Sequence, residues 1–126
     1  MIKIYSFLAY LFLSNYKRYR EMEQRIPDKS VKVYHPNWLL SLLLGERFLA
    51  ITFGNVIIAK FIHAHLISRI ARHEYTHVEQ YRRYGVFKFL YLYLSYFIKG
   101  LINYKNWLKA YYYNPLEVEA RLHETL

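Results

Sequence analysis

Apolar side chains recur at helical spacing between residues 67 and 81, and polar or charged side chains recur on the opposite side of the same segment. One carboxylate, Glu74, interrupts the apolar stripe. Gly85 follows, with basic residues at positions 82 and 83 just before it, a combination typical of a helix C-terminus. The pattern predicts an amphipathic helix that ends near Gly85. Within it Glu74 needs a function or a partner, because an unpaired buried carboxylate is costly.

Two β-branched and aromatic runs, at residues 48–53 and 56–60, precede this helix. The dipeptide between them, Gly54-Asn55, is a signal for a two-residue β-hairpin turn. Residues 31–34 could form a further short strand. We therefore expect a small antiparallel hairpin packed beside the helix. It either only covers the helix or also offers an edge strand to an extended peptide.

A long apolar run occupies residues 86–102 and is broken by Lys88, Lys99 and Gly100. Its length and flanking lysines would allow a position at or across a membrane. The run connects two segments with candidate site residues, so we expect a buried core helix whose lysines extend to the surface. Asn114-Pro115 then predicts the start of another helix, with Asn as N-cap and Pro at the first helical position.

The N-terminal segment is strongly apolar from residue 2 to residue 16 and is followed by Lys17, Arg18 and Arg20. It is shorter than the roughly 20 residues that span a bilayer. Basic residues follow the apolar run and no small-residue cleavage site is evident, so it makes no convincing signal peptide. We expect a core helix over residues 1–26, with a peripheral membrane contact through residues 2–16 as the alternative.

The composition fits one folded domain over residues 1–126, because 55% of the residues are apolar and 20% aromatic. The chain has no Cys, which excludes disulfides and Cys-based zinc sites. Its net charge of +9 fits an anionic membrane surface, nucleic acid or solubility alone. The basic residues are scattered, so we expect no specific nucleic-acid partner. The expected fold class is α+β, mostly α.

The predicted helix contains His73-Glu74-Tyr75-Thr76-His77, an HExxH motif. Residues at i and i+4 lie on one face of a helix, so His73 and His77 could bind one metal ion. Glu74 lies beside them, where it could take a proton from a water molecule. Gln80 extends the histidine face and could support a ligand by a hydrogen bond.

Three motifs in this order resemble small bacterial zincin-like proteins of the gluzincin type, which carry HExxH on one helix and a Glu on a later helix. The first is T-x-G-x-x-I at 52–57, the second H-E-x-x-H-x-x-Q at 73–80 and the third N-P-x-E-x-x-A at 114–120. The resemblance covers residues 48 to about 124 and leaves out the N-terminal helix predicted over 1–26. It implies a zincin-like fold and a zinc metallopeptidase, which is a hydrolase.

Position by position, the resemblance implies Zn²⁺ bound by His73, His77 and Glu117, with Glu74 as the catalytic base. Gln80 and Asn114 are expected to support this site from behind the ligands. Glu117 has a second role open to it, as the carboxylate of a capping box at the start of its helix. The chain departs from the related membrane-linked peptidases at Arg121, where they carry the Asp that supports a ligand histidine.

The expected substrate is a peptide or protein, cleaved by metal-activated water. Tyr111, Tyr112, Tyr113 and His123 are all candidates for stabilising the oxyanion. Two other functions stay open: a zincin-like scaffold that binds metal without turnover, and a basic protein that binds a membrane or nucleic-acid surface. The expected location is cytoplasmic or peripheral to the inner membrane.

Overall fold

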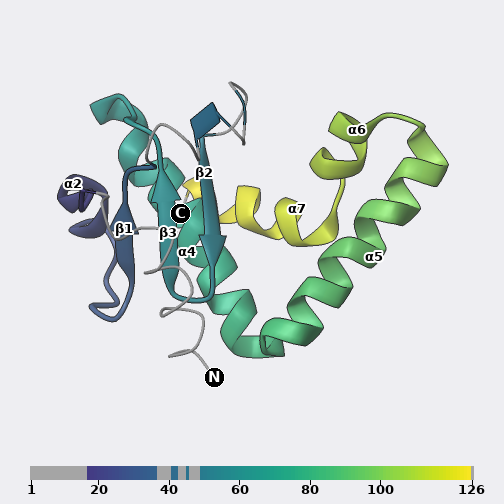
Figure 1. Cartoon of the computed structure of the whole chain (residues 1–126), viewed down its shortest axis with the longest axis horizontal. Helices are drawn as coiled ribbons and strands as arrows, with labels where there is room; N and C mark the ends of the chain where they lie inside the picture. The colour runs from purple at the N-terminus through teal and green to yellow at the C-terminus, as the bar shows by residue number, and fades with distance from the viewer. Residues whose placement is uncertain (1–16, 37–40, 43–44, 46–48, 126) are drawn as a thin grey trace.

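The structure is a computed structural model that describes residues 17–36, 41–42, 45 and 49–125. Within them a small sheet and two long helices are followed by shorter helices at the C-terminus (Figure 1). The named elements are α2 (Arg20–Glu23), β1 (Lys32–Tyr34), β2 (Ala50–Phe53), β3 (Val56–Ala59), α4 (Ala64–Tyr84), α5 (Val86–Tyr104), α6 (Trp107–Tyr112), α7 (Pro115–Leu122) and the 3₁₀-helix η1 (His123–Thr125). The expected class, α+β and mostly helical, is confirmed.

The sheet has three strands in the order β1-β3-β2. β2 and β3 pair in antiparallel register around Gly54, whose φ of 63° is the left-handed conformation that a tight hairpin turn requires. The predicted hairpin is thus confirmed, and so is the short strand after residue 31. The sequence did not indicate that β1 pairs parallel to β3, with Val33 opposite Ile57.

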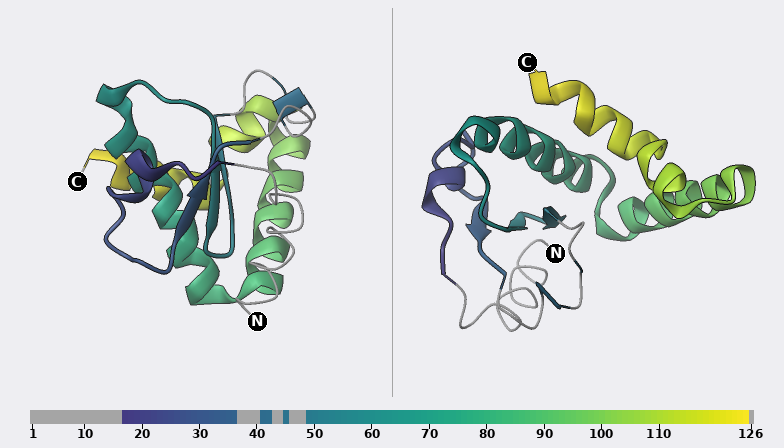
Figure 2. Two further views of the ribbon diagram at one scale, coloured as in Figure 1. Left: turned by 60° about the vertical axis from the view of Figure 1, so that its left-hand side comes forward. Right: turned by 90° about the horizontal axis from the view of Figure 1, so that it is seen from above.

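Helix α4 lies between the sheet and the α7–η1 segment, as the view from above shows (Figure 2, right). One side of α4 packs on the sheet and α2 through a cluster of buried apolar residues that includes Ile67, Ala71 and Val78. The helix ends at Tyr84, and Gly85 has a φ of 77°, which confirms the predicted stop. The opposite side of α4 is therefore free to carry polar groups toward α7.

The predicted N-terminal helix is wrong where the structure can test it, and residues 1–16 lie outside the described part of the chain. Among residues 17–26, which the structure describes, only 20–23 are helical. Before them the backbone pairs with β1: the amide of Tyr19 donates to the carbonyl of Val33 at 2.8 Å, and the amide of His35 donates to that of Lys17 at 2.9 Å. The free edge of β1 thus satisfies backbone groups that a continuous helix would have paired internally.

Helix α5 was expected to be a buried core helix, and this is wrong. Of its residues only Val86, Phe89 and Gly100 are buried. The helix breaks at Lys105, with a φ of 52°, and α6 folds back along it (Figure 1). The close approach requires Gly100, because a Cβ there would lie 2.8 Å from the Cα of Ala110. Packing on α4, α6 and α7 covers one side of α5 and leaves the other exposed.

Among the described residues, no single helix is both long and apolar enough to cross a membrane. Helices α4 and α5 are long and apolar enough only when they are taken together, and their axes are bent by 116° relative to each other.

Candidate metal centre

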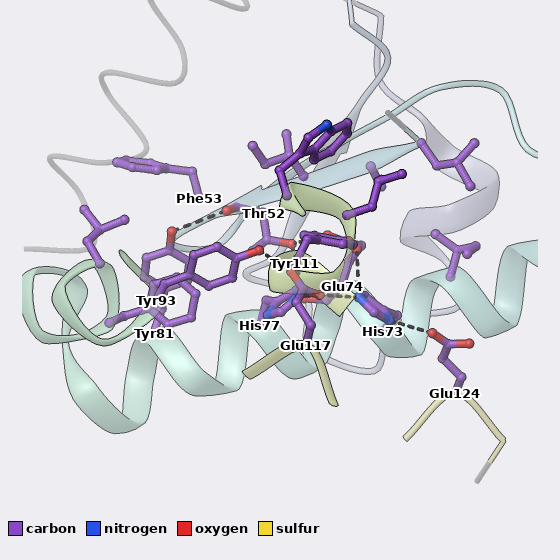
Figure 3. A pocket seen from close by; sticks show the side chains of 18 residues that line it. Thr52, Phe53, His73, Glu74, His77, Tyr81, Tyr93, Tyr111, Glu117 and Glu124 are labelled. Carbon is purple, nitrogen blue, oxygen red and sulfur yellow. Dashed lines mark hydrogen bonds and ion pairs between the residues drawn. The ribbon is translucent and has the colours of Figure 1, made fainter. Parts of the chain in front are cut away.

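A pocket of about 670 Å³ opens between β2 and the helices α4, α5, α6 and α7 (Figure 3). Most of its wall is apolar or aromatic, and its polar side chains gather on α4 and α7. His73, Glu74 and His77 all line this pocket, together with Glu117 from α7. The structure thus brings together the four residues for which the sequence predicted metal binding or catalysis.

The two histidines of α4 converge on one carboxylate oxygen. Oε1 of Glu117 lies 3.0 Å from Nε2 of His73 and 2.9 Å from Nε2 of His77. All three side chains are nearly buried, with exposed fractions of 9% for His73, 6% for His77 and 4% for Glu117. Helix α7 makes this possible because Asn114 and Pro115 start it in the right place: the Asn114 side chain accepts from the amide of Leu116 at 3.0 Å. The predicted helix start is confirmed, and Glu117 points to the histidines rather than back into a capping box.

The other ring nitrogen of each histidine also meets an oxygen. Nδ1 of His73 lies 2.6 Å from Oε2 of Glu124, and Nδ1 of His77 lies 2.8 Å from Oε1 of Gln80. The Gln80 amide can point only one way, because its nitrogen donates to the Leu116 carbonyl at 3.0 Å and to Glu119 at 2.7 Å. Both Nδ1 atoms are therefore donors, which leaves the Nε2 atoms to face Glu117.

This arrangement fits a bound cation. A neutral imidazole has one N–H, yet each ring here faces an oxygen acceptor at both nitrogens. Either both rings carry an extra proton or a metal ion lies between the Nε2 atoms and Glu117. Ligands about 2.0–2.1 Å from a tetrahedral zinc ion lie about 3.3 Å apart, close to the separations of the His73–Glu117 and His77–Glu117 pairs. The residues present therefore fit a His₂Glu zinc site.

Glu74 is a second carboxylate on the Nε2 side of His73. One ligand atom from each of His73, Glu74 and His77 lies within 4.8 Å of the others, so this trio could also hold a metal ion. However, Oε2 of Glu74 is 3.8 Å from Nε2 of His73, whereas Oε1 of Glu117 is 3.0 Å away. Glu117 thus lies closer to Nε2 of His73 than Glu74 does.

The charges at the centre shift the pKa values of its groups. Burial alone would lower the pKa of His77, but the hydrogen bond to Glu117 and its charge raise it to about 9. Burial alone would raise the pKa of Glu117, but hydrogen bonds from His73 and His77 hold it far below its ordinary value. Without metal, these shifts favour a protonated His77 beside an ionised Glu117. A metal ion would displace the proton.

Glu74 is held by the sheet. The hydroxyl of Thr52 in β2 donates to Oε1 of Glu74 at 2.9 Å, and the pair is buried. The backbone oxygen of Thr52 accepts in turn from the hydroxyl of Tyr81 at 3.4 Å. Burial raises the pKa of Glu74 above its usual value. The first residue of the T-x-G-x-x-I motif thus positions the carboxylate next to the histidines.

Tyr93 of α5 fixes the remaining oxygen of Glu117: its hydroxyl donates to Oε2 at 2.6 Å. Burial and the neighbouring Glu117 charge raise the pKa of Tyr93, so it stays a donor. Asn114 acts one step further back. Its side-chain nitrogen donates to the carbonyl of Tyr93 at 3.1 Å, so it ties α5 to the start of α7 and does not contact the histidines.

Of the four candidates for oxyanion stabilisation, only Tyr111 lines the pocket. Tyr112 and Tyr113 are half exposed: the Arg121 guanidinium lies over Tyr112, and Tyr113 stacks on Tyr104. His123 points away, with Nδ1 3.2 Å from the hydroxyl of Thr76.

The sequence did not predict the roles of three residues at the centre: Glu124, Tyr93, and Thr52 as the hydrogen-bond donor to Glu74. Glu124 places a carboxylate 2.6 Å from Nδ1 of His73, and Arg69 holds this carboxylate by a 2.7 Å ion pair. One signal was available, since Glu124 is seven residues after Glu117 on the same helical face of an acid-poor chain. No comparable signal distinguishes Tyr93 among fifteen tyrosines.

Comparison of the chain with protein-family models, with curated proteins and with solved structures gives no match.

Proposed function

We propose that this protein is a zinc-dependent metallopeptidase with a zincin-like fold, in which His73, His77 and Glu117 bind the metal and Glu74 is the general base. The observation that carries the proposal is the convergence of two histidine Nε2 atoms on one oxygen of Glu117, at 3.0 and 2.9 Å, in the floor of a pocket. Buried partners fix both Nδ1 atoms as well. Such support is typical of metal-binding histidines.

A bound zinc ion supplies Lewis acidity, which makes water more acidic and polarises a carbonyl group. Glu74 accepts the proton of the attacking water and later delivers it to the leaving amine. Its raised pKa suits this exchange, because a carboxylate with a higher pKa takes a proton more readily. Thr52 orients Glu74 through the 2.9 Å hydrogen bond. Tyr111, which lines the pocket, is the donor that we assign to the developing oxyanion.

The pocket wall supports a peptide as substrate. Strand β2 is an edge of the three-stranded sheet, and its residues 50–53 line the pocket. An edge strand can pair with an extended peptide through backbone hydrogen bonds. The lining side chains Leu49, Ile51 and Leu108 are apolar and exposed to more than 40%. We therefore expect cleavage next to apolar residues.

The test of this function is the substitution Glu74→Gln, matched with Glu79→Gln on the exposed side of the same helix. Glutamine keeps the shape of Glu74 but cannot accept the proton. Hydrolysis of a mixed peptide pool, followed by mass spectrometry, should fall at least about a hundredfold in Glu74→Gln, because general acid–base catalysis contributes typically 10²–10⁴ in rate. Zinc content should stay the same, and Glu79→Gln should resemble the wild type.

Full hydrolysis by Glu74→Gln would contradict the mechanism.

A second function is supported by the same geometry. Neighbouring side chains fix both oxygens of Glu117 and the Nδ1 atoms of both histidines, so these three residues could hold a metal ion without any turnover. That function, a zincin-like metal-binding scaffold, predicts stoichiometric zinc and no hydrolysis in any variant.

A further inference from the structure

Helix α5 carries a continuous apolar stripe on the side that faces away from α4. Phe87, Tyr91, Leu94, Ile98 and Ile102 follow one another at intervals of three or four residues, and their exposed fractions run from 46% to 74%. Figure 1 shows α5 and α6 extending together from the rest of the molecule. We call residues 86–113 the α5–α6 arm.

The charges of the arm are all of one sign. From residue 86 to residue 116 the chain has no Asp or Glu but four lysines, and all four are exposed: Lys88, Lys99, Lys105 and Lys109. On α5, Lys88 and Lys99 lie about 80–100° from the centre of the apolar stripe, at its margin. Trp107 and Tyr112 add exposed aromatic side chains from α6. An apolar stripe with lysines at its margin is the pattern of a helix lying in the interface of an anionic membrane.

The geometry favours a position along the membrane surface rather than across it. The side of α5 opposite the stripe packs on the molecule, where Phe89 joins Tyr81, Val86 and Leu116 in a buried cluster. A spanning helix would have to separate this packed side from the rest of the molecule, whereas a helix lying flat uses only the stripe. The length of α5, 19 residues or about 28 Å, allows several turns to contact the surface together.

We propose that the α5–α6 arm docks the protein on an anionic lipid bilayer, with the apolar stripe of α5 inserted between the headgroups and with Lys88 and Lys99 at the phosphates. Leu90, Trp107 and Leu108 belong to the arm and also line the pocket. The segment that docks therefore also forms part of the pocket wall. The proposal does not depend on the metal centre or on peptidase activity.

The test is co-flotation of the full chain with vesicles of phosphatidylcholine alone or of phosphatidylcholine with phosphatidylglycerol, at low and high salt and with EDTA. Phe87→Glu is compared with Phe61→Glu, since the two phenylalanines have nearly equal exposed fractions of 74% and 75% and Phe61 lies outside the arm. Binding should require phosphatidylglycerol, weaken with salt and ignore EDTA. Phe87→Glu should lower the affinity about tenfold or more, and Phe61→Glu should not.

The lysines give a second, independent variant. Lys88→Gln/Lys99→Gln should lower the affinity for the vesicles about fivefold for each lysine. Each basic side chain at an anionic surface strengthens binding by about that factor. The matched control is Lys29→Gln/Lys32→Gln on the sheet side. Equal melting temperatures show that each variant is folded.

Three results would overturn the proposal. Equal binding to both kinds of vesicle would remove the role of lipid charge. Loss of binding in Phe61→Glu but not in Phe87→Glu would move the contact away from the arm. A dimer in the absence of vesicles that Phe87→Glu converts to a monomer would make the stripe an interface between two copies of this chain.

Discussion

Helices α4 and α5 are adjacent in the chain, joined at Gly85, and similar in length, yet they use their faces in opposite ways. Besides its apolar side, α4 buries a polar face, with His73, Glu74, His77 and Gln80 all inside the molecule. The exposed face of α5 is apolar. Among the described residues, no buried side-chain nitrogen or oxygen lacks a hydrogen-bond partner. Polar groups can be buried on α4 because each is paired, which removes most of the cost of desolvation.

The comparison shows that burial depends on what lies opposite a helix and not on its own polarity. For α4 the sheet lies on one side and α7 with η1 on another. For α5 the exposed stripe faces away from the elements that the structure describes. The two helices therefore differ in what they contribute: α4 carries the core and the metal centre, and α5 provides one wall of the pocket and an outward surface.

The largest difference between the two helices should appear in stability. Ile67→Ala removes a side chain of α4 with an exposed fraction of 1% and should lower the free energy of unfolding by about 2–5 kcal/mol. Ile102→Ala makes the same change on α5 at a side chain with an exposed fraction of 69% and should change it by less than about 0.5 kcal/mol. Urea unfolding of the two variants measures both values. Similar losses in the two would mean that a partner covers the α5 stripe in solution.

A smaller effect should follow from the partner behind His73. Glu124→Gln keeps the size of the side chain but weakens its ion pair with Arg69 and its 2.6 Å contact with Nδ1 of His73. Removal of such a supporting group typically lowers metal affinity about 10–100-fold. Competition with a zinc-binding dye measures the change, and Glu79→Gln is the control. Unchanged affinity in Glu124→Gln would assign Glu124 a structural role only.

The smallest effect concerns the pH dependence of the metal-free protein. The pKa of His77 is raised to about 9 from an ordinary value of 6.5, so its contribution to stability is complete below 6.5 and is lost as the pH rises through 9. The pKa of Glu117 is lowered, so its contribution is present above about 4.5 and is lost as the pH falls. Stability in EDTA should therefore peak between these limits.

Zinc replaces the proton of His77, so the zinc-loaded protein should not lose stability between pH 7 and about 9. Melting temperatures measured across this range, with EDTA and with zinc, test the difference. Parallel curves for the two samples would show that the metal does not displace protons from the histidines.

Local signals made part of this structure predictable. The HExxH helix, its stop at Gly85, the Gly54-Asn55 hairpin and the Asn114 cap each depend on residues close in sequence, and all of them are present in the structure. The contact of Glu117 with the two histidines was expected only through the resemblance. No local sequence pattern predicts that α7 packs against α4.

The remaining features depend on contacts between distant segments. The parallel pairing of β1 with β3 crosses some 24 residues, and the chain before α2 pairs with β1 instead of forming a helix. Tyr93 reaches Glu117 across 24 residues, and Glu124 reaches His73 across 51. The apolar spacing of α5 predicted a helix correctly, but spacing alone does not state whether another element lies opposite.

The central claim is that the histidine face of α4 binds a metal ion, and elemental analysis of the purified protein tests it most directly. The comparison is between the wild type, His73→Ala/His77→Ala and the control His63→Ala/His65→Ala, which removes two exposed histidines at the start of the same helix. The account predicts about one zinc ion per chain in the wild type and the control, and almost none in His73→Ala/His77→Ala. Equal zinc content in all three proteins, or no zinc in any of them after purification and incubation with zinc, would contradict it.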